Sequence, residues 1–175
     1  MNAIDKKAAG IKLVVFDVDG VLTDGSLILG ENGNEYKIFH VRDGQGLVML
    51  RDSGCKVAVI TARSSRIVAE RMQSLGIEYV FQGQSDKGKT MDDLLAKTGI
   101  GQTQAAYVGD DFLDLPAMKK AGLAIAVADA HPAVREQADW VTTAPGGRGA
   151  AREVCELIMQ SQSTLQPVIL SYLDD

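Results

Sequence analysis

The sequence predicts an α/β fold in which a Rossmann-like parallel sheet forms the middle of three layers, with helices on both faces. Short apolar runs rich in valine and isoleucine alternate along the chain with segments of helical character, as they do in successive βαβ units. Several of these runs end abruptly in polar clusters. Such clusters are typical of open parallel sheets, which bind ligands at the carboxyl ends of their strands.

Bulk composition indicates one globular domain, which we expect to span residues 1–175. The chain of 175 residues is 46% hydrophobic and 23% charged, and its net charge of −5 argues against general nucleic-acid binding. No apolar stretch reaches the roughly 18 residues of a membrane span, and Met1–Lys7 shows no secretory signal. Cys55 and Cys155 lack metal-type spacing, so we expect buried free thiols. We therefore expect a cytoplasmic protein with no nucleic-acid or membrane partner.

The first predicted strand, Lys12–Phe16, ends in the sequence Asp17-Val-Asp19-Gly20. An apolar, β-branched run of this length is typical of a strand that is buried on both faces of a parallel sheet. Two carboxylates one residue apart repel each other. Mg²⁺ suits them because it takes one or two protein carboxylates and leaves room for a substrate phosphate. The alternative is an exposed acidic turn.

Residues 25–41 predict a β-hairpin flap, because two short apolar-rich runs surround an Asn-Gly tract. The insertion is too small to form a separate lid domain. A helix is predicted next over Asp43–Ser53, with Leu47 and Leu50 facing inward and Gly54 ending it.

The rest of the chain repeats the alternation of strand and helix. Further strands are predicted at Lys56–Ile60, Tyr79–Phe81, Ala105–Gly109, Leu123–Val127 and Trp140–Thr142. Further helices are predicted at 65–75, 87–97, 132–137 and 150–160, with another that ends near Ala121. The chain ends in a tail at about 162–175, which is apolar from Leu165 on without a helical period, so we expect it to be extended and to pack on another surface.

Four polar clusters follow successive predicted strands and are expected to meet at one edge of the sheet. They are Asp17 with Asp19, Thr61, Lys87, and Asp110 with Asp111 and Asp114. Their chemistry suits phosphoryl transfer through a covalent aspartyl phosphate. In such a reaction a carboxylate attacks phosphorus, while a metal ion and fixed donors hold the transferred oxygens.

Each carboxylate has a predicted role. Asp17 is the predicted nucleophile because it directly ends a rigid strand, and Asp19 would protonate the leaving alkoxide and later deprotonate the attacking water. The predicted metal ligands are Asp17, Asp19 and Asp110. Asp111 and Asp114 would hold metal-bound waters or orient the lysine of the cluster.

Thr61 and Lys87 are predicted to hold the phosphate oxygens. Thr61 offers a hydroxyl near a helix N-terminus, and Lys87 offers a positive point charge that also relieves the repulsion at Asp17. The alternatives are structural. Thr61 would be a helix N-cap, Lys87 a solvated residue in the first turn of a helix, and Asp110 or Asp111 a helix cap.

These residues occur in an order that resembles a known enzyme superfamily. Asp17-Val-Asp-Gly-Val-Leu-Thr, Ile60-Thr-Ala-Arg, Lys87 and Gly109-Asp-Asp-Phe-Leu-Asp together resemble the four motifs of the haloacid dehalogenase superfamily of phosphatases. Further segments are similar to a branch of it that removes phosphate from an eight-carbon sugar acid, on the route to lipopolysaccharide in Gram-negative bacteria. These segments are Phe39-His-Val-Arg-Asp-Gly, Val127-Ala-Asp-Ala-His-Pro and Gly146-Gly-Arg-Gly.

The resemblance implies Mg²⁺ as the cofactor and a cytoplasmic homotetramer, in which flaps pair and the tail reaches a neighbouring active site. No cap domain is expected, because the gaps between motifs hold only the flap, helices and a short strand. The residues implied to bind the substrate are His40, Val41, Arg42, Asp43, Gly44, Arg63, Arg71, Lys87 and Arg148. Arginine suits a sugar acid because its planar fork binds both carboxylate oxygens. The alternative for Arg71 is an exposed helix charge.

Three other functions remain open on the sequence. A phosphatase of sialic-acid-type 9-phosphates uses much the same frame. A phosphoaccepting receiver domain combines similar residue types, but its phosphoacceptor lies on a middle strand, and no aspartate ends Lys56–Ile60. A non-catalytic scaffold is expected to lack Asp17 or Asp19, and both are present.

Overall fold

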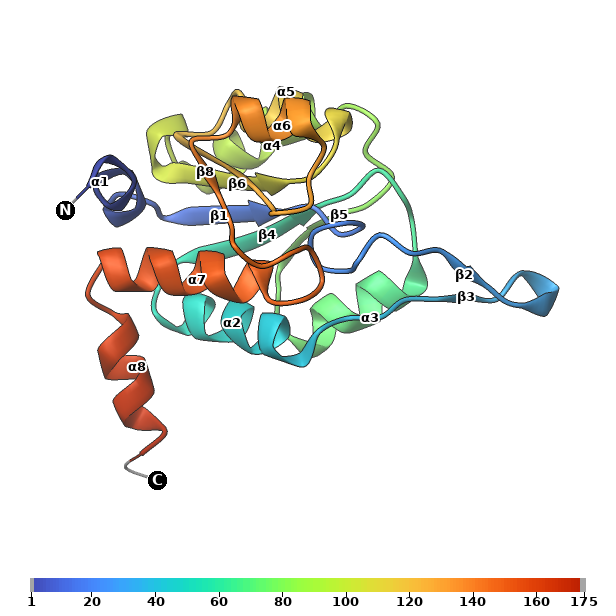
Figure 1. Cartoon of the computed structure of the whole chain (residues 1–175), viewed down its shortest axis with the longest axis horizontal. Coiled ribbons are helices and arrows are strands. Elements are labelled where there is room, and N and C mark those ends of the chain that lie inside the picture. Colours follow the sequence, from blue (N-terminus) through green and yellow to red (C-terminus); the bar gives the residue numbers. More distant parts are fainter. Residues whose placement is uncertain (1, 174–175) are drawn as a thin grey trace.

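The order of strands in the main sheet places the ends of the motif-bearing strands side by side. In the computed structural model, which describes residues 2–173, six parallel strands run in the order β5-β4-β1-β6-β7-β8. They are β1 (Leu13–Phe16), β4 (Lys56–Ile60), β5 (Tyr79–Phe81), β6 (Ala105–Gly109), β7 (Leu123–Ala126) and β8 (Trp140–Val141). Helices cover both faces of this sheet (Figure 1), which confirms the predicted three-layer α/β fold.

The helices form the two outer layers. They are α1 (Ala3–Ala9), α2 (Val41–Asp52), α3 (Arg66–Ser74), α4 (Lys87–Thr98), α5 (Leu115–Met118), α6 (Pro132–Gln137), α7 (Ala150–Ser161) and α8 (Leu165–Ser171). Helices α2, α3 and α7 lie on one face, and α4, α5 and α6 lie on the other (Figure 1). Within residues 2–173, no helix combines the length and the apolar character that crossing a membrane requires.

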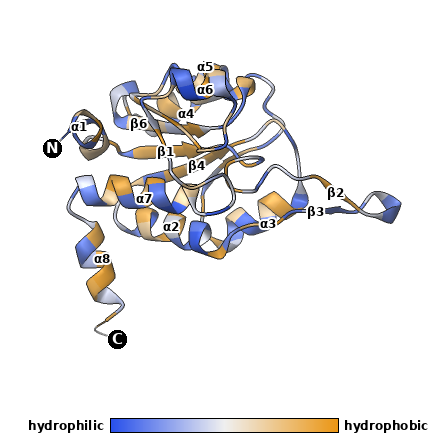
Figure 2. Cartoon of the chain, in the orientation of Figure 1, coloured by the Kyte–Doolittle hydropathy of each residue, from blue (hydrophilic) through white to orange (hydrophobic). Residues whose placement is uncertain are grey.

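The core is centred on β1, which lies between β4 and β6. Every residue of β1 and β6 is buried, and the central strands are mainly hydrophobic (Figure 2). Phe16 lies opposite Val59 on one side and Val108 on the other. This register brings the carboxyl ends of the three strands level with one another, so the residues that follow them are neighbours.

The predicted flap is a short hairpin that projects from the body of the molecule (Figure 1). Its strands, β2 (Ile28–Leu29) and β3 (Glu35–Tyr36), are antiparallel and joined through a single turn of 3₁₀ helix at Glu31–Gly33. Asn32 and Gly33 have φ values of 62° and 77°. These left-handed conformations are the ones that an Asn-Gly pair adopts readily, which explains why the tract marks the turn.

Two helices differ from what the sequence analysis expects. Helix α1 was not predicted, although Asn2 and Asp5 form a reciprocal capping box at its start. The expectation of an extended tail is wrong for Leu165–Ser171, which is α8; Asp174 and Asp175 lie outside the described residues. Pro167 is tolerated there because it stands in the first turn, where backbone N–H groups have no partner within the helix.

Candidate active site

The ends of β1, β4 and β6 and the start of α4 enclose one cavity. It is lined by Asp17, Asp19, Thr61, Ala62, Arg63, Lys87, Asp110, Asp111, Leu113 and Asp114. Asp17 continues β1 toward the cavity, and its N–H donates to the carbonyl of Val108 at 3.0 Å. The structure thus brings all four predicted polar clusters together, as expected for a shared edge of a parallel sheet.

Lys87 joins two carboxylates at the centre of this cavity. Its Nζ lies 2.8 Å from Asp17 Oδ1 and 2.7 Å from Asp114 Oδ1, and its side chain is 3% exposed. Burial alone would lower the pKa of Lys87, but the charges of Asp17 and Asp114 and their hydrogen bonds raise it above the ordinary value. Lys87 is therefore a buried cation, which excludes the solvated lysine considered above.

Asp114 accepts hydrogen bonds from four donor groups. Its Oδ1 accepts from Lys87 and, at 2.8 Å, from the hydroxyl of Tyr107. Its Oδ2 accepts the N–H groups of Asp110 and Asp111 at 2.9 and 3.2 Å. Asp114 is thereby fixed as the group that orients Lys87.

Tyr107 is a part of the site that the sequence analysis missed. It is fully buried in β6, and burial, followed by the charge of Asp114, raises its pKa well above the ordinary value, so it remains a hydroxyl donor. The signal was a tyrosine inside an otherwise apolar strand, because a buried phenol needs a hydrogen-bond partner.

Asp17, Asp110 and Asp114 offer oxygens that all lie within 4.8 Å of one another. Burial, followed by the charge of Asp114, raises the pKa of Asp17 to about 7 and that of Asp110 to about 8. In the part of the chain that the structure describes, Asp110 Oδ1 is buried without a hydrogen-bond partner. Because the three carboxylates lie close together and one buried oxygen of Asp110 has no hydrogen-bond partner among the described residues, the arrangement fits a hard divalent cation bound by Asp17 and Asp110.

Gly20 makes room for this arrangement. Its φ is +98°, and a Cβ at this position would collide with the carboxylate of Asp110. The glycine after the two aspartates therefore has a steric role as well as a conformational one.

The carboxylate of Asp19 is directed elsewhere. In the described part of the chain, the three-aspartate cluster does not include it; instead Asp19 Oδ1 pairs with Lys37 of the hairpin, and Oδ2 lies 3.9 Å from Arg63 Nε. Asp19 lines the cavity, while its assignments as the acid–base residue and as a metal ligand stay predictions.

The structure shows helix capping by Asp111 but not by Thr61, and it does not fit a receiver domain. Helix α3 begins after Ser65, so Thr61 is not its N-cap, and the Thr61 hydroxyl lies in the cavity lining. Asp111 does cap a short 3₁₀ helix by accepting the N–H of Phe112 at 2.8 Å, whereas Asp110 caps no helix within residues 2–173. The strand that a receiver domain would use for its phosphoacceptor ends at Ile60 and is followed by Thr61, not by an aspartate.

The predicted substrate residues separate into three groups. Arg63 and Lys87 line the aspartate cavity, whereas His40, Asp43, Gly44 and Arg71 line a separate small pocket. Val41, Arg42 and Arg148 are exposed, and Arg148 reaches Asp24 at 3.5 Å. Within one chain, only the first group lies at the carboxylates, and the substrate contacts of the others stay predictions.

Asp43 also has a structural contact that the sequence did not indicate. Its two oxygens accept the N–H groups of Gly149 and Arg152 at 3.1 and 2.9 Å, so it stabilises the start of α7 from α2.

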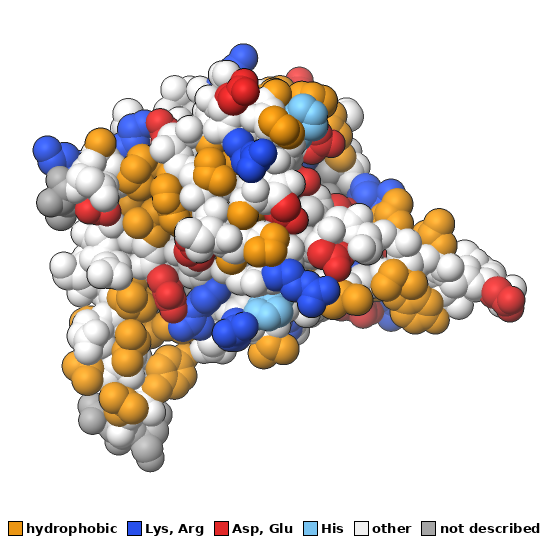
Figure 3. Space-filling view, in the orientation of Figure 1, with side chains coloured by type: hydrophobic (Ala, Val, Ile, Leu, Met, Phe, Trp, Pro, Cys, Tyr) orange, Lys and Arg blue, Asp and Glu red, His pale blue; other side chains and the backbone are white. Residues whose placement is uncertain are grey.

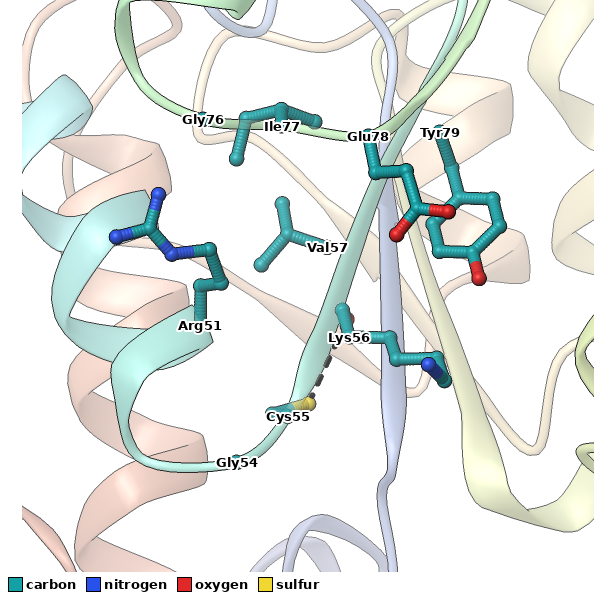
Figure 4. A pocket seen from close by; sticks show the side chains of 9 residues that line it. All are labelled: Arg51, Gly54, Cys55, Lys56, Val57, Gly76, Ile77, Glu78 and Tyr79. Atoms are coloured by element: carbon teal, nitrogen blue, oxygen red, sulfur yellow. Dashed lines mark hydrogen bonds between the residues drawn. The ribbon is translucent and has the colours of Figure 1, made fainter.

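A second pocket lies at the opposite, amino-terminal ends of β4 and β5 (Figure 4). It is lined by Arg51, Gly54, Cys55, Lys56, Val57, Gly76, Ile77, Glu78 and Tyr79. Glu78 is the one carboxylate in this lining, and burial raises the pKa of Cys55 to about 12, so its thiol is not a nucleophile at neutral pH. This pocket lacks both an acidic pair and an activated nucleophile.

The raised pKa values predict a pH-dependent stabilisation by a divalent cation. Without metal, the pKa values of Asp17 and Asp110 in the folded protein are about 7 and about 8, rather than 3.8. Between about pH 4 and about pH 8 the folded state therefore binds more protons than the unfolded state. The free energy of unfolding of the metal-free protein therefore falls as the pH rises through this window. Mg²⁺ at about 100 times its Kd adds about 2.7 kcal/mol to the free energy of unfolding. For a domain of this size, that corresponds to a rise of about 5–10 °C in Tm.

Calorimetry with Mg²⁺ and with EDTA, at about pH 5 and about pH 8, measures this effect. We expect Mg²⁺ at a single fixed concentration to raise Tm more at the higher pH, where the cation does not compete with protons. Equal shifts at the two pH values would contradict the assignment of these carboxylates as the cation site.

Comparison with known proteins finds a family and many relatives. The model of the haloacid dehalogenase-like hydrolase family matches residues 78–153. A 3-deoxy-D-manno-octulosonate 8-phosphate phosphatase of Escherichia coli is 50% identical over 159 residues, which is 91% of this chain and 85% of that protein. A phosphatase of the same description from Yersinia pestis is 47% identical over 161 residues, 92% of this chain and 86% of that protein.

Solved structures give the same result. The structure of such a phosphatase from Moraxella catarrhalis, in complex with magnesium, phosphate and KDO, has a TM-score of 0.96 and 45% identity and covers 98% of this chain and 99% of that one. The Yersinia pestis structure has a TM-score of 0.92 and 46% identity and covers 93% of this chain and 88% of that one.

Proposed function

This chain belongs to the 3-deoxy-D-manno-octulosonate 8-phosphate phosphatases of the haloacid dehalogenase-like hydrolases, and from that membership we propose that it hydrolyses this phosphomonoester to KDO and inorganic phosphate. The enzyme uses Mg²⁺ and acts in lipopolysaccharide biosynthesis. The observation that carries the proposal is the position of Lys87, paired with both Asp17 and Asp114 beside the buried, unpartnered oxygen of Asp110.

The reaction proceeds in two steps on Asp17. A carboxylate oxygen of Asp17 attacks phosphorus and the bond from phosphorus to the sugar oxygen breaks, while Asp19 gives its proton to that leaving oxygen. Asp19 then takes a proton from water as the water attacks phosphorus, which releases inorganic phosphate and restores Asp17. Mg²⁺, for which Asp17 and Asp110 offer oxygens, supplies positive charge that lets the phosphate approach two carboxylates.

Three groups around Asp17 hold the transferred oxygens. Thr61 Oγ accepts the N–H of Arg63 at 3.3 Å, which leaves its own hydroxyl proton free to donate to phosphate. Ala62, whose backbone N–H is a further donor, lines the same cavity, and Lys87 contributes a fixed positive charge. Asp114 and Tyr107 position Lys87, and Asp111 holds Asp114 through a reciprocal capping box.

The sugar acid is bound by positive side chains beyond the phosphate. Arg63 is the first candidate because it lines the same cavity and is half-exposed toward solvent. Arg71 lies over the ring of Phe39 at 6.0 Å, in the pocket with His40 and Gly44. Together with Arg148, these residues would bind the carboxylate and hydroxyls of the sugar acid. Each arginine would act either at the active site of its own subunit or at that of a neighbouring subunit.

The subunits assemble as a cytoplasmic homotetramer in this proposal. Figure 3 shows hydrophobic side chains on the projecting arm. The exposed large apolar residues of the hairpin segment are Leu27, Ile28, Leu29, Tyr36 and Ile38. Exposed apolar surface of this kind supports contact with another subunit. In Figure 1, helix α8 lies away from the carboxyl ends of β1 and β4, so its exposed Ile169 and Leu170, and Tyr172 directly after it, would cover a neighbour. Light scattering in solution measures the assembly, and a monomer would contradict it.

Phosphate release from a panel of phosphorylated sugar acids tests the proposed activity. We expect kcat/KM for KDO 8-phosphate to exceed that for N-acetylneuraminate 9-phosphate by about tenfold or more, because the substrates differ in length and substituents. We also expect EDTA to abolish turnover. Faster hydrolysis of the nine-carbon substrate would assign the sialic-acid-type function instead, and no release of phosphate would reject the enzyme.

A further inference from the structure

The base of the hairpin carries a lysine that is buried against the acid–base residue. Lys37 directly follows β3, between the exposed side chains of Tyr36 and Ile38, yet its own side chain is 1% exposed. Its Nζ pairs with Asp19 Oδ1 and lies 3.5 Å from Glu35 Oε1. The proposed reaction assigns no role to Lys37.

Lys37 belongs to a closed ring of four alternating charges. Glu35 Oε1 also accepts from Arg63 Nη2 at 3.1 Å, and Arg63 Nε lies 3.9 Å from Asp19 Oδ2. The ring joins the loop after β1, the hairpin and the loop after β4. Each oxygen of Asp19 thus has its own cationic neighbour, so rotation of this carboxylate about its side chain is restricted.

Stability alone is a weak reason for this placement. A buried ammonium group loses its hydration, and replacing a buried ion pair by apolar groups is often neutral or stabilising. Because side chains alternate between the two faces of an extended segment, Lys37 points away from the face that exposes Tyr36 and Ile38. A lysine buried there against Asp19 therefore points to positioning of the carboxylate.

We propose that Lys37 is a positioning residue that fixes Asp19 Oδ1, so that Oδ2, on the side of Arg63 and the cavity, is aimed at the leaving oxygen. Glu35 in turn holds Lys37 and Arg63 in place. The inference rests on the proposed phosphatase function. It extends that function by making the hairpin part of the proton-transfer apparatus within the same chain.

The dependence on leaving group tests this role in the full-length, Mg²⁺-loaded enzyme. We compare kcat/KM for wild type and Lys37→Met on KDO 8-phosphate and on a series of aryl and alkyl phosphates without a carboxylate. The ratio kcat/KM covers only the steps up to release of the alcohol. We expect a loss of about 10- to 100-fold for alkyl phosphates, which need a proton on the leaving oxygen, and of less than about threefold for p-nitrophenyl phosphate.

Matched variants separate positioning from a general structural role. Lys37→Arg keeps the charge and should recover part of the alkyl phosphate activity, whereas Lys89→Met, at an exposed position on α4, should change neither substrate class. If Lys37→Met fails to fold, Glu35→Gln leaves the lysine in place. This variant should show a smaller loss than Lys37→Met, again larger for alkyl phosphates than for p-nitrophenyl phosphate.

The outcomes distinguish the two proposals. A wild-type enzyme without phosphatase activity would reject the proposed function. An active wild type whose Lys37→Met and Glu35→Gln variants lose aryl and alkyl phosphate activity equally, or lose neither, would reject positioning by Lys37 and leave the function intact.

Discussion

Asp17→Asn should leave less than about a thousandth of the wild-type kcat. The amide cannot form an acyl phosphate, so the two-step path through a covalent intermediate is closed. A factor of a thousand corresponds to about 4 kcal/mol of lost transition-state stabilisation. Steady-state phosphate release with KDO 8-phosphate at saturating Mg²⁺ measures the effect.

The same variant should remain folded. Its amide has nearly the shape of the carboxylate, and Lys87 keeps Asp114 as a partner at 2.7 Å. In the absence of metal, removal of a carboxylate whose pKa is raised to about 7 by burial should not lower Tm at neutral pH. Asp93→Asn, at an exposed position on α4, is the matched control and should retain full activity. Turnover near the wild-type level in Asp17→Asn would reject Asp17 as the nucleophile.

Lys87→Met should lower both kcat/KM and the free energy of unfolding. The first effect comes from the lost contact to phosphate, and the second from the lost ion pairs. Loss of the fixed charge beside Asp17 removes a contact to the transferred phosphate, for which we expect a drop of about 100- to 1,000-fold in kcat/KM. Loss of the shared cation also leaves Asp17 and Asp114, both buried, without their common partner. Breaking a buried ion pair in this way typically costs about 3–5 kcal/mol.

The stability loss should depend on pH in a defined direction. At about pH 8 the metal-free variant must bury anionic carboxylates without Lys87, whereas at about pH 5 Asp17, with a pKa of about 7 even in the wild type, is already protonated. We expect Tm to fall by about 10 °C at the higher pH and by clearly less at the lower one. Calorimetry in EDTA measures both values, and Lys89→Met serves as the control. A larger loss at pH 5 than at pH 8 would contradict the ion pairing.

Much of the site could be predicted because local sequence and sheet geometry agree. A buried parallel strand must end where its backbone leaves the sheet, so polar residues directly after β1, β4 and β6 have to face the same edge. This placed Asp17, Thr61 and Asp110 correctly in one cavity from residue types and spacing alone. The position of Lys87 in this cavity could also be predicted, because the third predicted strand leads into α4 at the same edge of the sheet.

The partners of these residues could not be predicted in the same way. Lys37 looks like one more polar residue of a hairpin, and nothing beside it in the chain indicates that it folds back onto Asp19. Asp43 looks like an acidic residue in the first turn of α2, which is sufficient to explain it, yet it stabilises α7 from a distance of 106 residues. Helix α8 is short and has Pro167 in its first turn, so its local signal is weak.

The amino-acid sequence by itself determined the chemistry that each strand delivers to the sheet edge: carboxylates after β1 and β6, a hydroxyl after β4, and a lysine at the start of α4. Only the tertiary structure decided which oxygen meets which cation, so that Asp17 and Asp114 share Lys87 while Asp19 turns to Lys37. The reason is physical. Strand ends follow from local hydrophobicity, whereas side-chain pairing depends on strand order, register and the path of loops, which the whole chain settles together.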